Sequence, residues 1–285
     1  MRHYEYHRPR SLDEALRLRA EIPDSRYIAG GTDVMVQIRG RVSRPAALIS
    51  LSSIPELHGV TIDDNGARIG AMTRIVELVE HRALRERYPV LVEAALRLGS
   101  PQIRNVATVG GNLCNASPCA DTATPLLALE ARLRLRGAAG ERELPLEQLF
   151  LGAGETALAP GELLAEIVLL PPGPTARATF KKKGRVRMDL ALASATVLVE
   201  LDGAVCRRAR VAAGSVAPTP LRLKEVEALL AGQALTADVL AAAGTAAAGA
   251  VSPISDVRCT AEYRRQLVAV YVKRALEELA ARSRS

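Results

Sequence analysis

The sequence predicts an α+β fold in two parts, and three observations lead to this class. Short strand-like and helical segments are mixed through the first part of the chain. The segment 171–174, Pro-Pro-Gly-Pro, is the clearest break in that pattern. Beyond it, three strand-like segments precede three helical ones, which predicts an antiparallel sheet packed by helices. We therefore expect one domain at 1–172, itself built of parts at about 1–55 and 56–172, and a second at 173–285.

Caps, breakers and apolar spacing define the elements of the first domain. Ser11 is a predicted N-cap with Glu14 at the capping-box position, and Pro23 ends that helix. The pair Asn65-Gly66 marks a hairpin tip, and Pro89 separates two helices. In order, we expect strand 4–8, the helix after Ser11, strand 26–30, helix 34–41, strand 47–54, hairpin 58–73, helices 75–88 and 90–98, and strand 131–137.

The second domain shows longer alternating segments followed by alanine-rich and leucine-rich ones. The pair Asp202-Gly203 is typical of a hairpin turn between two of its strands. We expect strands at 178–184, 190–203 and 209–216, and helices at 221–231, 236–249 and 261–282.

Composition limits the classes of function. Hydrophobic residues make up 48% and charged residues 24% of the 285, which is typical of a soluble globular protein. No stretch approaches the length of a membrane span and no signal peptide opens the chain, so we expect a cytoplasmic location, although export with a signal-bearing partner stays open. The net charge of +7 could suggest nucleic acid, but aromatic residues make up only 3%. A basic surface that docks acidic partner subunits is the alternative.

Two glycine-rich segments carry the strongest functional signal. Residues 98–131 contain Gly110 and Gly111, which allow the main chain to approach a ligand closely, and consecutive N–H groups in such a turn can bind an anion. Residues 26–41 contain a similar run, Ala-Gly-Gly-Thr-Asp at 29–33. Neither matches the Rossmann or P-loop pattern. Two such loops could clamp one diphosphate, which favours a nucleotide cofactor; each could also be only a tight turn between a strand and a helix.

Asp121 stands between the two glycines of the second segment and the helix that follows them. With Thr122 and Thr124 it offers N-cap oxygens to a helix that has Pro125 in its first turn. A carboxylate is also a good acceptor for ligand hydroxyl groups. Both roles are open from the sequence.

The two loops resemble those of a known family. The runs AGGTD at 29–33 and TVGGN at 108–112, with Asp121 nine residues later, are similar to the FAD-binding medium subunit of the molybdenum hydroxylases. That family includes xanthine, aldehyde, nicotinate and aerobic carbon monoxide dehydrogenases. The resemblance covers essentially the whole chain, including GELLAEIVL at 161–169, FKKKG at 180–184 and SDVRCTAEYRRQL at 255–267. It implies a PCMH-type FAD-binding domain followed by an α+β domain.

The resemblance implies a role for each matching residue. The first diphosphate loop would be Ala29, Gly30, Gly31, Thr32, Asp33 and Val34, and the second Thr108, Gly111 and Asn112. Asp121 would contact ribose or ribityl hydroxyls, while Leu98, Leu164 and Lys181 would lie near the isoalloxazine ring. Lys182 and Lys183 are expected on a solvated face. Four residues of the C-terminal signature are expected to be structural or to contact subunits: Asp256, Arg258, Tyr263 and Arg264.

The implied function is that of a non-covalent FAD carrier in a larger complex. A large subunit would hold molybdopterin and a small subunit two 2Fe–2S clusters, and the FAD would pass electrons to NAD, a quinone or another acceptor. A dimer of heterotrimers is expected. We expect no catalytic residue and no metal ligand in this chain, because the cysteines do not form a four-ligand set and no histidine lies in a glycine loop. Buried thiols are expected for Cys114, Cys119, Cys206 and Cys259.

Two alternatives stay open. One is an independent FAD-dependent oxidoreductase with its own substrate pocket. The other is a non-catalytic scaffold subunit whose flavin loops are vestigial.

Overall fold

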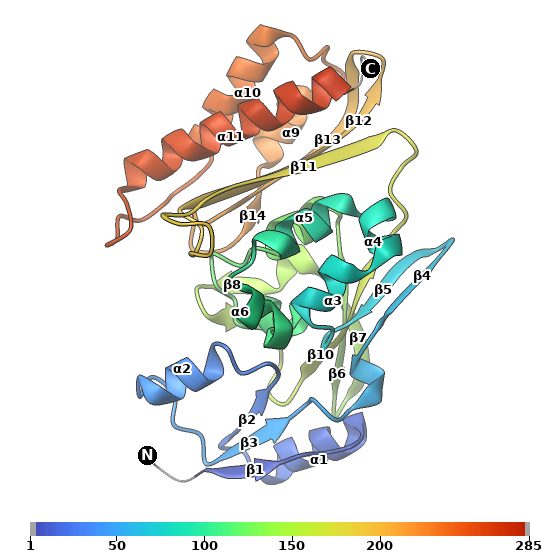
Figure 1. Ribbon diagram of the computed structural model, residues 1–285, viewed down its shortest axis with the longest axis vertical. Helices are drawn as coiled ribbons and strands as arrows, with labels where there is room; N and C mark the ends of the chain where they lie inside the picture. Colours follow the sequence, from blue (N-terminus) through green and yellow to red (C-terminus); the bar gives the residue numbers. More distant parts are fainter. Residues whose placement is uncertain (1–3, 283–285) are drawn as a thin grey trace.

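A computed structural model describes residues 4–282, which form three parts stacked along the long axis of the molecule (Figure 1). The N-terminal part is a parallel sheet in the order β1-β3-β2 with two helices. Its elements are β1 (Glu5–His7), α1 (Leu12–Glu21), β2 (Ser25–Ile28), α2 (Val34–Arg39) and β3 (Ala47–Ser50). The cap of α1 is confirmed, since the Ser11 hydroxyl accepts from the Glu14 N–H at 3.2 Å.

The middle part contains an antiparallel five-stranded sheet in the order β4-β5-β10-β6-β7. Its strands are β4 (Val60–Asp63), β5 (Gly66–Gly70), β6 (Arg132–Gly137), β7 (Gly140–Pro145) and β10 (Leu163–Leu169), with the small pair β8 (Phe150–Gly152) and β9 (Glu155–Thr156). Its helices are η1 (Pro55–Leu57), α3 (Ile75–Glu80), α4 (Arg82–Arg87), α5 (Pro89–Arg97), α6 (Pro101–Val106), α7 (Val109–Cys114), α8 (Ala123–Ala128) and η2 (Leu146–Gln148). The hydrophobic core of this part lies between the sheet and the helices, and it includes the fully buried Ile69, Leu133 and Ile167.

The hairpin and the helix that follows it differ in detail from the prediction. The expected helix 75–88 is two helices, because the His81 ring nitrogen Nδ1 accepts from the Leu84 N–H at 3.2 Å and begins α4. The hairpin tip lies one residue earlier than expected: Asp63 pairs with Gly66, so Gly66 opens β5 with φ +125°.

The C-terminal part is an antiparallel sheet in the order β11-β12-β13-β14. Its elements are β11 (Ala176–Lys183), β12 (Ala193–Asp202), β13 (Val205–Gly214), β14 (Leu221–Arg222), α9 (Lys224–Leu230), α10 (Ala237–Gly249) and α11 (Ala261–Arg282). Helix α11 covers one face, and α5 and α8 of the middle part cover the other (Figure 1). Phe180 on β11, fully buried against Val90 and Ala94 of α5, joins the two parts. The predicted α+β class is confirmed.

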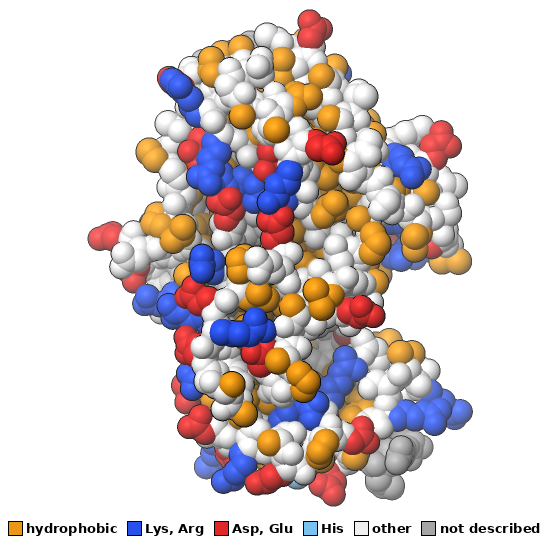
Figure 2. All heavy atoms as spheres, turned by 180° about the vertical axis from the view of Figure 1, so that it is seen from behind, with side chains coloured by type: hydrophobic (Ala, Val, Ile, Leu, Met, Phe, Trp, Pro, Cys, Tyr) orange, Lys and Arg blue, Asp and Glu red, His pale blue; other side chains and the backbone are white. Residues whose placement is uncertain are grey.

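The surface carries no single charged face in the view from behind, where lysine and arginine side chains lie among aspartate and glutamate (Figure 2). Ion pairs between neighbouring strands include Arg132–Glu143 at 2.9 Å and Arg134–Glu166 at 2.9 Å. Within residues 4–282, no helix is long and apolar enough to cross a membrane.

Candidate functional site

The two glycine segments lie against one another. A Cβ added at Gly30 would overlap the carbonyl oxygen of Val106 at the end of α6, so this position needs glycine for close packing. A Cβ added at Gly111 would lie 3.5 Å from the Cβ of Ala29. Segments about eighty residues apart in the sequence therefore meet at one place, as two loops that hold one ligand must.

The first segment offers unused backbone donors. Gly31 has φ +74°, the left-handed region that favours glycine, and α2 begins three residues later. Within the described part of the chain, the N–H groups of Gly31, Thr32 and Asp33 donate no hydrogen bond. Asp33 precedes α2, but its side chain makes no capping bond. A run of free N–H groups in such a bend is suited to an anion.

The second segment is not the open turn that its two glycines predict. Both lie inside the short helix α7, capped by Thr108, and neither has positive φ. Gly110 is required by packing, because a Cβ there would lie 2.6 Å from the Cβ of Ala71. Gly111 has little room as well: its Cβ would lie 2.9 Å from the Thr108 hydroxyl oxygen.

The expectation of free N–H groups in this second segment is therefore wrong. Its donors are already used inside the protein: Val109 N–H to Thr73 O at 3.0 Å, Gly110 N–H to Ala71 O at 2.9 Å, and Gly111 N–H to Thr108 Oγ1 at 3.1 Å. What the segment presents to a ligand is side chains and close backbone, not a row of amides.

Asn112 connects this helix to the next one. Its side-chain oxygen accepts from the Thr122 hydroxyl at 2.6 Å. Thr122, not Asp121, occupies the N-cap of α8, and no side chain caps that helix. The predicted capping role of Asp121 is thus wrong, and its carboxylate serves another purpose.

Asp121 forms a buried ion pair with Lys182 of β11. The carboxylate oxygen Oδ2 lies 2.6 Å from the ammonium nitrogen, and the two side chains are 5% and 4% exposed. Burial raises the pKa of Asp121 to about 6, against the opposing charge and hydrogen bond of Lys182. The other oxygen, Oδ1, is buried and has no hydrogen bond to any described residue. The ammonium also donates to the Arg97 carbonyl at 3.0 Å, next to Leu98.

Lys181 and Lys182 lie on opposite faces of β11 and have different partners. Successive side chains of a strand point to opposite faces, and Lys181 pairs with Glu278 of α11 on the face away from Asp121. The expectation that Lys182 lies on a solvated face is wrong. Leu98 and Leu164, 7% and 3% exposed, belong to the buried core that also contains α7.

These groups fit the polar parts of FAD. The free N–H groups of Gly31, Thr32 and Asp33 suit a diphosphate, and an orphaned carboxylate oxygen on Asp121 suits a hydroxyl donor. A buried acceptor without a donor is costly unless a ligand supplies one. The sequence signal for this site was the pair of glycine runs; the signal for Lys182 was the strand alternation after Phe180.

Comparison with known proteins decides the family. Residues 2–172 match the FAD binding domain in molybdopterin dehydrogenase, and residues 178–279 match the CO dehydrogenase flavoprotein C-terminal domain. The chain belongs to this family. It is 33% identical over 280 residues to the xanthine dehydrogenase FAD-binding subunit of Escherichia coli O157:H7, covering 97% of this chain and 96% of that one. The identity to the carbon monoxide dehydrogenase medium chain of Hydrogenophaga pseudoflava is also 33%, covering 98% of each.

The family likeness extends to solved structures. A carbon monoxide dehydrogenase from Hydrogenophaga pseudoflava, lacking the Mo-pyranopterin moiety of its cofactor, matches with a TM-score of 0.96 at 34% identity, over 99% of this chain and 98% of that one. The predictions of the family, of the fold and of an oxidoreductase subunit with an FAD-binding domain are confirmed. The roles of single residues stay predictions.

Proposed function

We propose that this chain is the FAD-carrying electron-transfer subunit of a heteromeric molybdenum hydroxylase. It takes electrons from the 2Fe–2S clusters of a small subunit, whose large partner holds molybdopterin, and passes them to NAD, a quinone or another acceptor. The proposed assembly is a dimer of heterotrimers in the cytoplasm. We also propose domain limits of 1–172, in parts of about 1–55 and 56–172, and 173–285. The relatives named above, a medium chain and an FAD-binding subunit, support this reading.

The observation that carries the proposal is a pair of unsatisfied polar features: free backbone N–H groups in the first segment, which meets α7 through Ala29, and an orphaned carboxylate oxygen on Asp121. They suit a cofactor with a diphosphate and many hydroxyl groups. The N–H groups at 31–33 would hold the diphosphate, with Ala29 and Val34 shaping the loop. Thr108, Gly111 and Asn112 would close its other side. Asp121 would accept a hydroxyl, and Leu98 and Leu164 would pack near the ring. When bound, FAD supplies the redox chemistry, converting single electrons to pairs.

We propose that Lys182 takes the place expected of Lys181 beside the flavin. The Lys182 ammonium is held at a fixed point by Asp121 and by the Arg97 carbonyl, whereas Lys181 is tied to α11. A fixed buried cation favours negative charge near it, which is how protein groups adjust flavin electronics.

The proposal is tested by the flavin content of two glycine variants. In Gly111→Val, the new side chain enters the narrow space beside Thr108 and Ala29, so FAD should be lost. Gly249→Val is the matched control, because a Cβ at Gly249, also in a helix, meets no atom within 4 Å. The measurement is visible absorption followed by acid release of the chromophore, with circular dichroism to show that each variant folds. Full FAD retention in Gly111→Val would remove the second segment from the site.

The wild-type chain separates the proposal from its alternatives. A colourless chain that takes up no FAD would contradict the proposed function and favour a scaffold subunit. The complex, captured through a tag on this chain in its own host, should contain iron and molybdenum by elemental analysis. FAD without either metal would favour an independent flavoprotein.

A further inference from the structure

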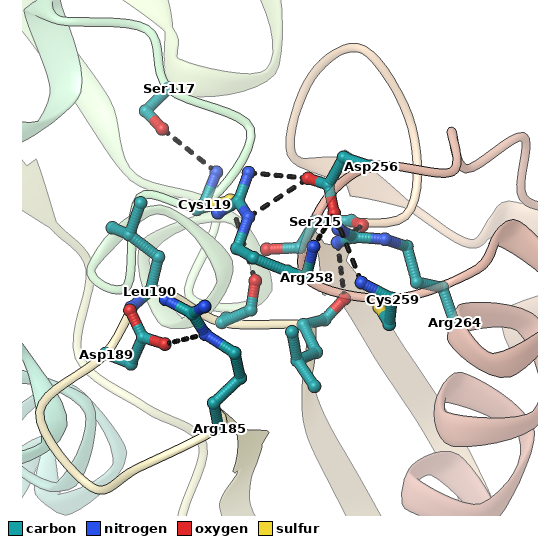
Figure 3. A network of polar contacts seen from close by, with 12 residues as sticks. Ser117, Cys119, Arg185, Asp189, Leu190, Ser215, Asp256, Arg258, Cys259 and Arg264 are labelled. Atoms are coloured by element: carbon teal, nitrogen blue, oxygen red, sulfur yellow. Dashed lines mark hydrogen bonds and ion pairs between the residues drawn. The ribbon is translucent and has the colours of Figure 1, made fainter.

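A charged network joins the start of α11 to the middle part of the molecule (Figure 3). Its centre is Asp256, whose Oδ1 accepts from the Arg258 N–H at 2.9 Å, the Cys259 N–H at 3.3 Å and the Arg264 guanidinium at 2.9 Å. Its Oδ2 accepts from the Arg258 guanidinium at 3.0 Å. Burial alone would raise the pKa of Asp256, but these hydrogen bonds outweigh it and hold the pKa at about 2.

Arg264 anchors this centre in the C-terminal part. Its side chain is 2% exposed and donates to the carbonyl of Leu192 at 2.7 Å and to that of Ser215 at 3.0 Å. Leu192 directly precedes β12 and Ser215 directly follows β13. The first turn of α11 is therefore fixed to one end of the sheet independently of Arg258.

Arg258 reaches from the centre to the other part of the molecule. Its guanidinium lies 3.8 Å from the Cys119 sulfur, which itself contacts the Ala191 carbonyl at 3.7 Å. Next to this contact, the Ser215 N–H donates to the Pro118 carbonyl at 2.7 Å. The segment 117–119 is thus held by the C-terminal part at both its backbone and its side chain, as Figure 3 shows.

The held segment leads directly into the candidate flavin site. Asp121 stands two residues after Cys119 and directly before Thr122, whose hydroxyl donates to the Asn112 side-chain oxygen at 2.6 Å. Its ion pair with Lys182 joins the same two parts of the molecule. Asp121 therefore lies between two anchors, the Asn112–Thr122 hydrogen bond on one side and the contacts of the segment 117–119 on the other, and the second anchor is the one that the C-terminal part supplies.

We propose that Arg258 is a positioning residue: oriented by Asp256, it holds Cys119 and so places the Asp121 carboxylate for FAD. The inference rests on the proposed function. Arginine suits this role because its planar fork can bind the carboxylate on one side and the sulfur on another. Lysine is a single point charge without this planar fork, so it cannot reproduce the same geometry toward both partners.

The experiment is a double-mutant cycle on FAD affinity in the purified full chain. Arg258→Ala, Cys119→Ala and the double variant are compared with the wild type by FAD titration, and apo-protein thermal unfolding is recorded for each. If Arg258 acts through Cys119, Arg258→Ala should weaken binding about tenfold, as loss of a charge-assisted contact does. The double variant should then be no weaker than the weaker single variant. Arg258→Lys should recover part of the affinity, and the absorption spectrum of bound FAD should change in Arg258→Ala.

Arg185→Ala is the control: among residues 4–282, Arg185 forms a hydrogen bond and ion pair with Asp189 alone, at 2.6 Å on the neighbouring loop, and it shares the electrostatic field of Arg258 and Asp256 without a bond to either (Figure 3). It should keep wild-type affinity within about twofold. Wild-type affinity in Arg258→Ala, or effects that simply add in the double variant, would overturn the inference. If Arg258→Ala does not fold, the Cys119→Ala variant is sufficient for the test: wild-type FAD affinity in that variant would overturn the inference. A wild-type chain that binds no FAD would instead overturn the proposed function on which it rests.

Discussion

Replacing Lys182 by methionine should destabilise the protein by about 3–5 kcal/mol at pH 8, the usual cost of breaking a buried ion pair. The ammonium and the Asp121 carboxylate lie 2.6 Å apart, and their side chains are 4% and 5% exposed. Without the cation, a buried carboxylate has lost its charge partner. Methionine keeps an unbranched apolar stem, so the loss reports the charge and not the packing.

The size of this loss should depend on pH through Asp121. Burial raises the pKa of its carboxyl from 3.8 to about 6 even though Lys182 opposes the rise. Without Lys182 the pKa rises further. A carboxyl group whose pKa is higher in the folded than in the unfolded protein lowers the free energy of unfolding as the pH rises above its pKa in the unfolded protein. The deficit of Lys182→Met should therefore be largest at pH 8 and should narrow towards pH 4.

Lys181→Met is the matched control for this prediction. Lys181 stands next in the chain, but its pair with Glu278 is 26% and 30% exposed, so at most about 1 kcal/mol should be lost. Urea unfolding followed by circular dichroism at pH 5 and pH 8 measures both variants, and FAD content is read on the same samples. Equal losses in the two variants, or loss of FAD from Lys181→Met alone, would refute the assignment of Lys182.

Three further outcomes are expected. Glu130→Gln should cost about 1–3 kcal/mol in urea unfolding, because this half-exposed carboxylate pairs with the buried Arg210 at 2.5 Å and Arg222 at 3.5 Å. An unchanged midpoint would show that the contact between the two parts does not depend on Glu130. Gly110→Ala should lower stability by about 1–3 kcal/mol in thermal unfolding, since its Cβ would lie 2.6 Å from another side-chain carbon; a higher melting temperature would contradict this packing. Burial raises the pKa of the Cys206 thiol to about 11, so iodoacetamide should modify it only after unfolding, as read by peptide mass; rapid modification of the native protein would contradict its burial.

The sequence was sufficient for elements with strong punctuation. The predicted helix 261–282 agrees with α11 up to Arg282, the last residue that the structure describes, and the predicted helix 236–249 agrees with α10, which Thr236 caps. Thr236 and the hairpin at 58–73 are local signals, in which a few neighbouring residues decide the backbone. The helix predicted at 75–88 failed for the same kind of reason, because one side chain, His81, competes locally for a backbone N–H.

The second glycine segment could not be read locally. Glycine is a poor helix former, so Gly110 and Gly111 predict a turn. In the structure both are helical, and the absence of a side chain lets α7 pack closely at Gly110 against Ala71 and at Gly111 against the Thr108 hydroxyl. The predicted close approach of the main chain to a ligand stays a prediction; the close approach that the structure shows is to the protein's own atoms. The sequence around Gly110 and Gly111 does not indicate that this segment will pack against Ala71, at the end of β5.

The lysine run at 181–183 shows how a family resemblance and strand geometry can disagree. A shift of one residue moves a side chain to the opposite face of a strand. In a run of three identical lysines, an alignment to the family can shift by one residue and so assign the wrong face. The apolar neighbour decides it. Phe180 is fully buried against α5, and Lys182, two residues along, must share that face, whereas Lys181 must share the face of α11. Alternation from Phe180 therefore places Lys182 beside Asp121, and the same alternation explains why Lys181 is free to tie β11 to Glu278.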